Sequence, residues 1–230
     1  MTRASFRVLI GRAALHVLVH WRPYLLLVSA AFLLQGALFF FVRSGAALEI
    51  GDLVVLPVLT AASYALVGRE FGLFPDVFRR VLARGALVVA LDFLESFALS
   101  LALVSFAAGD TFTGVALLGV NVSLIYADVF AVFHDPPEVL LIARAVGRST
   151  LTAWNGLDNI GRSIALVALQ ILPAFLVNQL QLQLAAHHVA FASFWAGVPL
   201  GTIVVPPLSA LTALVYLDAT GIQAQRTCGE

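Results

Sequence analysis

The chain has 230 residues, of which 61% are hydrophobic and only 11% are charged. Soluble domains are roughly 45–50% apolar and about 25% charged, so this composition excludes an ordinary soluble enzyme, a disordered chain and a nucleic-acid-binding domain. Thirteen basic residues, all arginine, balance thirteen acidic ones, and the net charge therefore identifies no partner. At about 20 apolar residues per membrane-spanning helix, the length accommodates about six spans, which predicts a polytopic membrane protein.

Six apolar stretches organise residues 1–230 as one all-α membrane domain. They cover residues 24–42, 50–67, 85–108, 113–133, 160–182 and 189–217. Lipid offers backbone N–H and C=O groups no hydrogen-bonding partners, so these stretches are expected to be transmembrane helices. The sixth is too long to cross upright and contains Pro199, Pro206 and Pro207, which predicts a tilted and kinked helix.

Further helices are predicted outside the six spans. Residues 1–22 are too rich in arginine and histidine for a span, but their valine, leucine and isoleucine content suits a helix lying at the membrane surface. Residues 74–84 and 138–153 are predicted to be amphipathic helices on the cytoplasmic side.

The arginines orient the predicted bundle. Twelve of the thirteen fall on one side of the membrane, and only Arg43 falls on the other. Cytoplasmic loops carry an excess of basic residues. Both termini are therefore expected to be cytoplasmic.

Asp92 and Glu95 are the most informative residues because they lie inside the third span. Three positions apart, they share one helical face. A charge in the middle of a span costs about 2.5–3.5 kcal/mol on insertion scales, so such a residue needs a partner or a use. The pair predicts either a proton relay or polar substrate site, or a structural seam that only holds helices together.

Asn121 and Asp128 extend this polar pattern into the fourth span. Seven positions apart, they also share one helical face. A short outer link makes the third and fourth spans antiparallel neighbours, so Asn121 could reach Glu95 or Ser96. Asp128 lies nearer the inner end and could reach Arg84 or Asp92. We expect these residues to form an intramembrane polar seam.

His16 and His20 lie four positions apart in the N-terminal helix, a spacing that can bind a metal. No third cysteine, histidine or acid ligand is close to them in the sequence, so we favour a polar stripe that faces lipid headgroups, and we expect no metal or other cofactor. The chain also contains no glycine-rich phosphate loop, nucleophile elbow or His-Glu-x-x-His helix. These observations predict a protein that is not an enzyme.

Asp218 is predicted to lie where the sixth span leaves the membrane. On the same side it could pair with Arg144, Arg148 or Arg162, or it could simply end the helix in water. These arginines and Arg84 could equally bind anionic lipid headgroups.

Residues 127–221 carry three segments that match a known pattern. They are Ala143-Arg144-Ala145-Val146-Gly147-Arg148-Ser149, then Trp154-Asn155-Gly156 leading to Arg162, and Pro206-Pro207 followed by Leu214-Val215-Tyr216-Leu217-Asp218. In these segments the chain resembles the integral membrane domain associated with some bacterial glycerophosphoryl diester phosphodiesterases, and its free-standing relatives. That family usually has Tyr at position 217 and a basic residue after Asp218. The resemblance implies a six-helix module of the bacterial cytoplasmic membrane, and the phosphodiesterase activity of the family belongs to a separate soluble domain.

Three functions remain open from the sequence. The first is a non-enzymatic membrane module, namely a scaffold, assembly or lipid-interacting subunit whose partners are membrane lipids and other membrane subunits or copies of itself. The second is a small permease, or the membrane half of an ATPase-driven transporter, with a polar route at Asp92 and Glu95. The third is a subunit of an electron-transfer or pigment complex.

Overall fold

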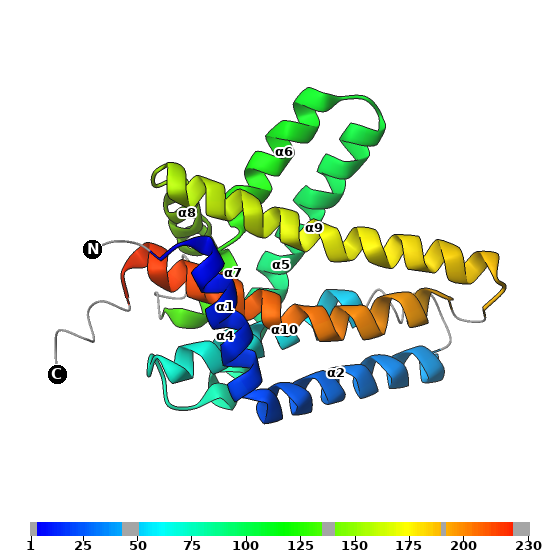
Figure 1. Cartoon of the computed structure of the whole chain (residues 1–230), viewed down its shortest axis with the longest axis horizontal. Helices are drawn as coiled ribbons and strands as arrows, with labels where there is room; N and C mark the ends of the chain where they lie inside the picture. The colour runs from blue at the N-terminus through cyan, green and yellow to red at the C-terminus, as the bar shows by residue number, and fades with distance from the viewer. Residues whose placement is uncertain (1–3, 43–50, 135–140, 190–191, 223–230) are drawn as a thin grey trace.

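The computed structural model describes residues 4–42, 51–134, 141–189 and 192–222, which are helical apart from short connections (Figure 1). The α-helices are α1 (Phe6–Val19), α2 (Trp21–Val42), α4 (Leu56–Glu70), α5 (Val77–Ala107), α6 (Thr111–Leu124), α7 (Ala127–Phe133), α8 (Leu141–Ala153), α9 (Leu157–Ala186) and α10 (Ala192–Thr220). A π-helical turn, Gly51–Val55, leads directly into α4.

Six of the described helical segments are long and apolar enough to cross a membrane. They are Trp21–Phe41, Leu53–Glu70, Val77–Ala107, Thr111–Phe133, Leu157–Ala186 and Phe194–Thr220. Each overlaps one of the six predicted stretches, and the described residues contain no strand. The chain is therefore an all-α polytopic membrane protein, as its composition predicts.

The third span is longer than predicted because α5 begins eight residues before the apolar run. Asp76 caps its N-terminus, where the Asp76 carboxylate accepts a hydrogen bond from the backbone N–H of Arg79 at 3.1 Å. No proline follows to interrupt the helix, which runs unbroken for 31 residues. The amphipathic helix predicted over 74–84 is continuous with the third span, because residues 77–84 are the first two turns of α5, and residues 74–76 precede the helix.

The fourth span is broken between α6 and α7, a feature that its apolar sequence did not predict. At the break, the backbone N–H of Tyr126 donates to the Ser149 hydroxyl of α8 at 3.0 Å. The Tyr126 hydroxyl accepts a hydrogen bond from the Ser163 hydroxyl of α9 at 3.1 Å. All three side chains are buried, so polar groups of two other helices stabilise the interruption that places α7 as a separate short helix.

The predicted amphipathic helix over 138–153 corresponds to α8, and residues 138–140 lie outside the described residues. Its buried face includes Ala145 and Ser149, four positions apart, whereas Arg144 and Arg148 are exposed. The Trp154 indole N–H at its end donates to the Ser123 hydroxyl of α6 at 2.8 Å. This helix therefore lies against the bundle and turns its basic face outward.

The predicted N-terminal helix is α1, which is separated from α2 by a turn at His20. Its residues Leu9, Ala13 and His16 are buried, and this spacing forms one helical stripe. The stripe packs mainly against α10, whereas Arg7 and Arg12 are exposed. α1 is thus attached to the bundle, and its placement at the membrane surface stays a prediction.

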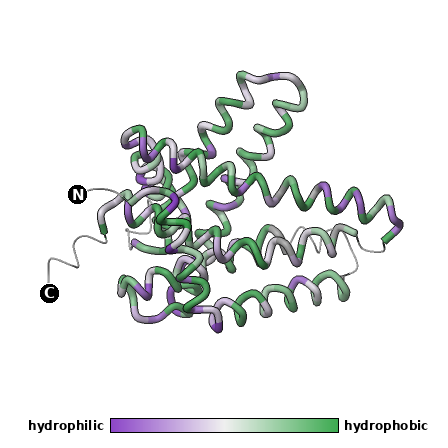
Figure 2. The backbone as a smooth tube through the Cα atoms, in the orientation of Figure 1, coloured by the Kyte–Doolittle hydropathy of each residue, from purple (hydrophilic) through white to green (hydrophobic). Residues whose placement is uncertain are grey.

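The long helices separate into two arms (Figure 1). One arm is the α5–α6 pair, and the other contains the α9–α10 pair with α2 packed against α10. α4 contacts both α5 and α10 and so joins the arms. Figure 2 shows mostly hydrophobic residues along the long helices and more hydrophilic residues at the end where α1 and α8 lie.

Small residues allow α4 and α10 to approach closely. Ala61 and Ala65 of α4, one turn apart, and Ala210 and Ala213 of α10 are each 0% exposed. In a membrane, helices associate largely through such close packing, because lipid offers no hydrophobic driving force. α10 is helical throughout although three prolines lie inside it, and the kink expected at these prolines stays a prediction.

Candidate functional site

A cavity of about 340 Å³ lies within the membrane-spanning part of the bundle. We call it the acid-lined cavity, because three carboxylates are among its lining residues. Its polar lining comes from α4, α5, α7, α9 and α10 and consists of Thr60, Tyr64, Asp92, Glu95, Ser96, Asp128, Gln170, Ser209 and Thr212. Residues from both arms and from the helix that joins them thus meet around one space.

Asp92 and Glu95 both line this cavity from α5. Glu95 is buried and Asp92 is half-buried. Their spacing of three places them on one helical face, and packing of α5 against α4 turns that face toward the interior rather than toward lipid. The geometry therefore provides two adjacent carboxyl groups at membrane depth.

Asn121 fastens the α5–α6 arm beside Glu95. Its side-chain amide N–H donates to the backbone carbonyl of Glu95 at 3.0 Å, and the contact is buried. The sequence placed Asn121 within reach of Glu95, but the bond goes to the main chain, so the Glu95 carboxylate stays directed to other partners. The Gln170 side chain of α9 lines the same cavity and lies close to Glu95.

Asp128 reaches the acid-lined cavity from α7, whose position depends on the break after α6. The residue is only 3% exposed. The sequence placed it within reach of Asp92 or Arg84, and the structure brings it to the same cavity as Asp92. Within the described part of the chain, one carboxylate oxygen of Asp128 and one of Glu95 are buried without a hydrogen-bond partner.

The acid-lined cavity contains no basic side chain among the described residues that line it. An ionised carboxylate in a span costs about 2.5–3.5 kcal/mol on insertion scales, and neighbouring carboxylates disfavour one another's ionisation. A cation that entered the cavity would relieve both effects. The arrangement can therefore bind a positively charged group or exchange protons with a solute.

Sequence reasoning missed several polar residues of the cavity. Gln170 lies one turn before Pro173 in α9, while Ser209 and Thr212 lie on one face of α10. Single hydroxyl and amide residues of this kind are common wherever membrane helices pack closely. Their spacing in the sequence does not indicate a site. They become part of one because α9 and α10 meet α5 around the cavity.

A second polar cluster joins the ends of the described chain. The Arg162 guanidinium pairs with the Asp218 carboxylate at 2.7 Å, with side chains only 8% and 13% exposed. Arg162 also donates to the backbone carbonyl of Ala4 at 2.5 Å, and the Ala4 N–H donates to Asp218 at 3.3 Å. Of the three arginines predicted as partners of Asp218, Arg162 forms the pair, whereas Arg144 and Arg148 are exposed on α8. Arg84, which was predicted to bind lipid headgroups or form an ion pair at the cytoplasmic face, is half-buried on α5.

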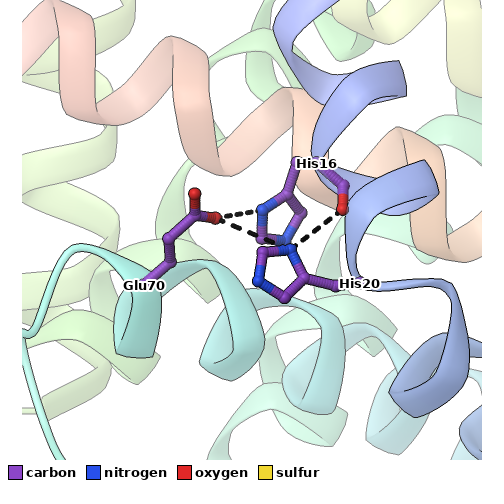
Figure 3. A group of neighbouring side chains, drawn as sticks. All are labelled: His16, His20 and Glu70. Carbon is purple, nitrogen blue, oxygen red and sulfur yellow. Dashed lines mark hydrogen bonds and ion pairs between the residues drawn. The ribbon is translucent and has the colours of Figure 1, made fainter.

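A third cluster brings His16 and His20 of α1 to Glu70 at the end of α4 (Figure 3). The His16 Nδ1 atom contacts the Glu70 carboxylate, and its Nε2 atom lies 3.0 Å from the Tyr24 hydroxyl. Burial lowers the pKa of His16, and the Glu70 carboxylate opposes this shift. The stripe expected to face lipid headgroups is therefore wrong at His16, which is only 7% exposed and faces α4.

Comparison with family models, with curated proteins and with solved structures finds no match for this chain. The resemblance of residues 127–221 to the phosphodiesterase-associated membrane domain stays a prediction.

Proposed function

We propose that this protein is a small permease, or the membrane half of a transporter, that binds a small organic cation in the acid-lined cavity. The observation that carries the proposal is the presence of three carboxyl groups, Asp92, Glu95 and Asp128, around one intramembrane cavity whose described lining has no basic residue. A purely structural seam would pair these acids with basic groups, as the Arg162–Asp218 pair does elsewhere in the fold.

The size and lining of the cavity suit a small solute. Ligand sites in proteins commonly occupy about 300–1,000 Å³, and the cavity of about 340 Å³ lies at the small end of this range. Hydroxyl groups of Thr60, Ser209 and Thr212 and the amide of Gln170 surround the carboxylates. This mixture favours an ammonium compound that also carries hydroxyl groups, with protons as the coupling ion.

We also propose that the protein lies in the bacterial cytoplasmic membrane with both termini in the cytoplasm. The twelve arginines on one side of the predicted topology support this orientation. Reporter fusions after Arg84 and after Arg148 should read as cytoplasmic, and a fusion at Gly109 should read as external. A cytoplasmic signal at Gly109 would contradict the topology.

The binding test uses the full-length protein in detergent micelles. Ethylamine, ethanolamine and choline are added separately, and the unfolding temperature is measured against equal concentrations of glycerol and sodium acetate. A ligand that binds only the folded state stabilises it by about 2.7 kcal/mol at a hundred times its dissociation constant. We expect at least one of the three amines to raise the unfolding temperature, and neither control compound to do so.

Matched variants connect the effect to the cavity. Asp92→Asn, Glu95→Gln and Asp128→Asn should each weaken the stabilisation by amines, because an amide keeps the size of the side chain but not its charge. Asp76→Asn and Asp158→Asn change exposed acids at helix starts and should leave it unchanged. Equal stabilisation of the wild type and the three cavity variants would refute the proposal.

Transport is then measured in proteoliposomes with the amine that binds. Uptake that depends on a pH gradient and is lost in Glu95→Gln would support a proton-coupled permease. Co-purification of an ATPase would instead assign the energy source to a partner, with α8 as its docking point.

The second candidate function is the non-enzymatic scaffold or lipid-interacting subunit. The observation in its favour is that α8 turns Arg144 and Arg148 outward, where they can meet anionic headgroups or another subunit. It predicts that Arg144→Gln/Arg148→Gln releases co-purifying lipid or protein, whereas the three amide substitutions in the cavity have no effect. That pattern would replace the permease proposal.

A further inference from the structure

The cluster of His16, His20 and Glu70 is the one group in the described part of the chain that offers three metal-ligand atoms close together. Those three atoms, one from each residue, all lie within 4.8 Å of one another. The two histidines come from one face of α1 and the glutamate from the last residue of α4, 50 positions after His20. The fold thus supplies the third ligand that the sequence lacked around the histidine pair.

The distances allow a metal ion to enter with small side-chain movements. Zinc binds imidazole nitrogen at about 2.0–2.1 Å and carboxylate oxygen at about 2.0–2.2 Å, which places two tetrahedral ligands roughly 3.3 Å apart. His20 Nδ1 lies 4.0 Å from the nearer Glu70 oxygen, and both side chains are more than a third exposed. His20 would exchange its contact with the backbone carbonyl of His16, 3.1 Å away, for the metal.

The surroundings of His16 already orient it as a metal ligand. Its Nδ1 atom faces Glu70, while its Nε2 atom lies 3.0 Å from the hydroxyl of Tyr24. Tyr24 is buried at 3% exposure, and its ring meets the imidazole edge-on at 5.7 Å. Metal-binding histidines commonly donate their second ring N–H to such an oxygen, which fixes the ring and its tautomer.

We infer that His16, His20 and Glu70 bind one divalent transition-metal ion of the zinc type and thereby fasten α1 to the end of α4. Two imidazoles and one carboxylate suit zinc or cobalt, whereas magnesium and calcium prefer sites made of oxygen ligands alone. Three protein ligands leave a fourth tetrahedral position for water. This site is separate from the acid-lined cavity, with which it shares no residue.

Cobalt provides a direct spectroscopic test on the full-length protein, purified with a tag that contains no histidine. Co²⁺ is titrated into the metal-free protein, and the visible absorption of tetrahedral cobalt is followed before Zn²⁺ is added in competition. We expect one equivalent of Co²⁺ to bind and one equivalent of Zn²⁺ to displace it. Absence of this absorption and of tight Zn²⁺ binding would overturn the inference and leave a simple ion pair.

The variants separate this site from adventitious binding by surface histidines. His20→Ala and Glu70→Gln should each weaken Co²⁺ binding about tenfold or more, since even outer-shell changes cost 10–100-fold. The matched control is His187→Ala/His188→Ala, which removes two exposed histidines after α9 and should leave the titration unchanged. Loss of binding in this control, with normal binding in His20→Ala, would refute the site.

A stability measurement guards against variants that misfold. Zn²⁺ should raise the unfolding temperature of the wild type and of His187→Ala/His188→Ala, and a chelator should reverse the rise. Glu70→Gln keeps a side chain of the same size and should fold, but Zn²⁺ should not raise its unfolding temperature. An equal rise in Glu70→Gln would show that the metal stabilises the protein elsewhere and would overturn the inference.

Discussion

The Arg162–Asp218 pair and the acid-lined cavity both bury carboxylates in the same bundle. Among the described residues, the pair provides a cation for its carboxylate and the lining of the cavity does not. Asp218 has a guanidinium at 2.7 Å and an N–H from Ala4. Glu95 and Asp128 each have one buried oxygen with no hydrogen-bond partner among the described residues. A buried charge that is fully paired fixes helices in place, whereas a buried carboxylate with an unpaired oxygen is available to a ligand.

The largest expected effect is on the paired side of this comparison. Arg162→Leu leaves Asp218 and the backbone carbonyl of Ala4 without their donor, and removing one partner of a buried pair costs about 3–5 kcal/mol. We expect a sharply lower unfolding temperature in detergent, measured by circular dichroism. The double variant Arg162→Leu/Asp218→Leu should recover much of the loss, because no uncompensated charge remains. A single variant as stable as wild type would contradict the role of the pair.

The cavity should respond in the opposite direction. Asp92→Asn/Glu95→Gln/Asp128→Asn removes three carboxyl groups that have no basic partner in the described lining, so the unfolding free energy should stay level or rise by about 1 kcal/mol. The measurement is the same unfolding experiment without added amines. A loss comparable to that of Arg162→Leu would show that the acids are structural, and the comparison between the two regions would fail.

A smaller effect is expected for the hydrogen bond that joins α6 to α5. Asn121→Ala removes the hydrogen bond to the Glu95 carbonyl, and side-chain hydrogen bonds between membrane helices average about 0.6 kcal/mol. The unfolding temperature should fall slightly. Val115→Ala, at an exposed position of the same helix, leaves that hydrogen bond intact and controls for a general weakening of α6. No difference between Asn121→Ala and wild type would show that packing alone holds the arm.

The smallest effect concerns an acid exposed at the tip of the same arm. Asp110 caps α6 by accepting a hydrogen bond from the Thr113 N–H at 3.0 Å. Hydrogen bonds from the Thr113 side chain and from this N–H lower the pKa of Asp110. Its contribution is therefore complete above its ordinary pKa of about 3.8 and disappears as the pH falls through the lowered value. Asp110→Asn keeps a capping side chain that does not titrate.

The unfolding temperatures of the wild type and of Asp110→Asn are measured between pH 5 and pH 3. Wild type should lose slightly more stability than Asp110→Asn over this interval, because all other acids titrate in both. An identical pH dependence would mean that the cap contributes nothing to the stability of α6.

The sequence by itself determined the class of this protein and the number of its spans. A single apolar run of span length is expected to form a helix in lipid, since a helix makes all its backbone hydrogen bonds within the segment. The same reasoning singled out Asp92 and Glu95, because an ionisable residue in a span is costly wherever it lies. The helical period then placed both acids on one face before any partner was known.

Only the tertiary structure decided which groups meet. Asp128 faces the cavity because the fourth span breaks at Tyr126, where Ser149 of α8 accepts a backbone hydrogen bond, and nothing in the apolar run of that span marks the break. Gln170 of α9 and Glu70 of α4 acquire their roles from helices distant in sequence. The local sequence pattern indicates the helical periodicity and which buried residues are costly. The contacts between helices depend instead on how several helix surfaces pack together.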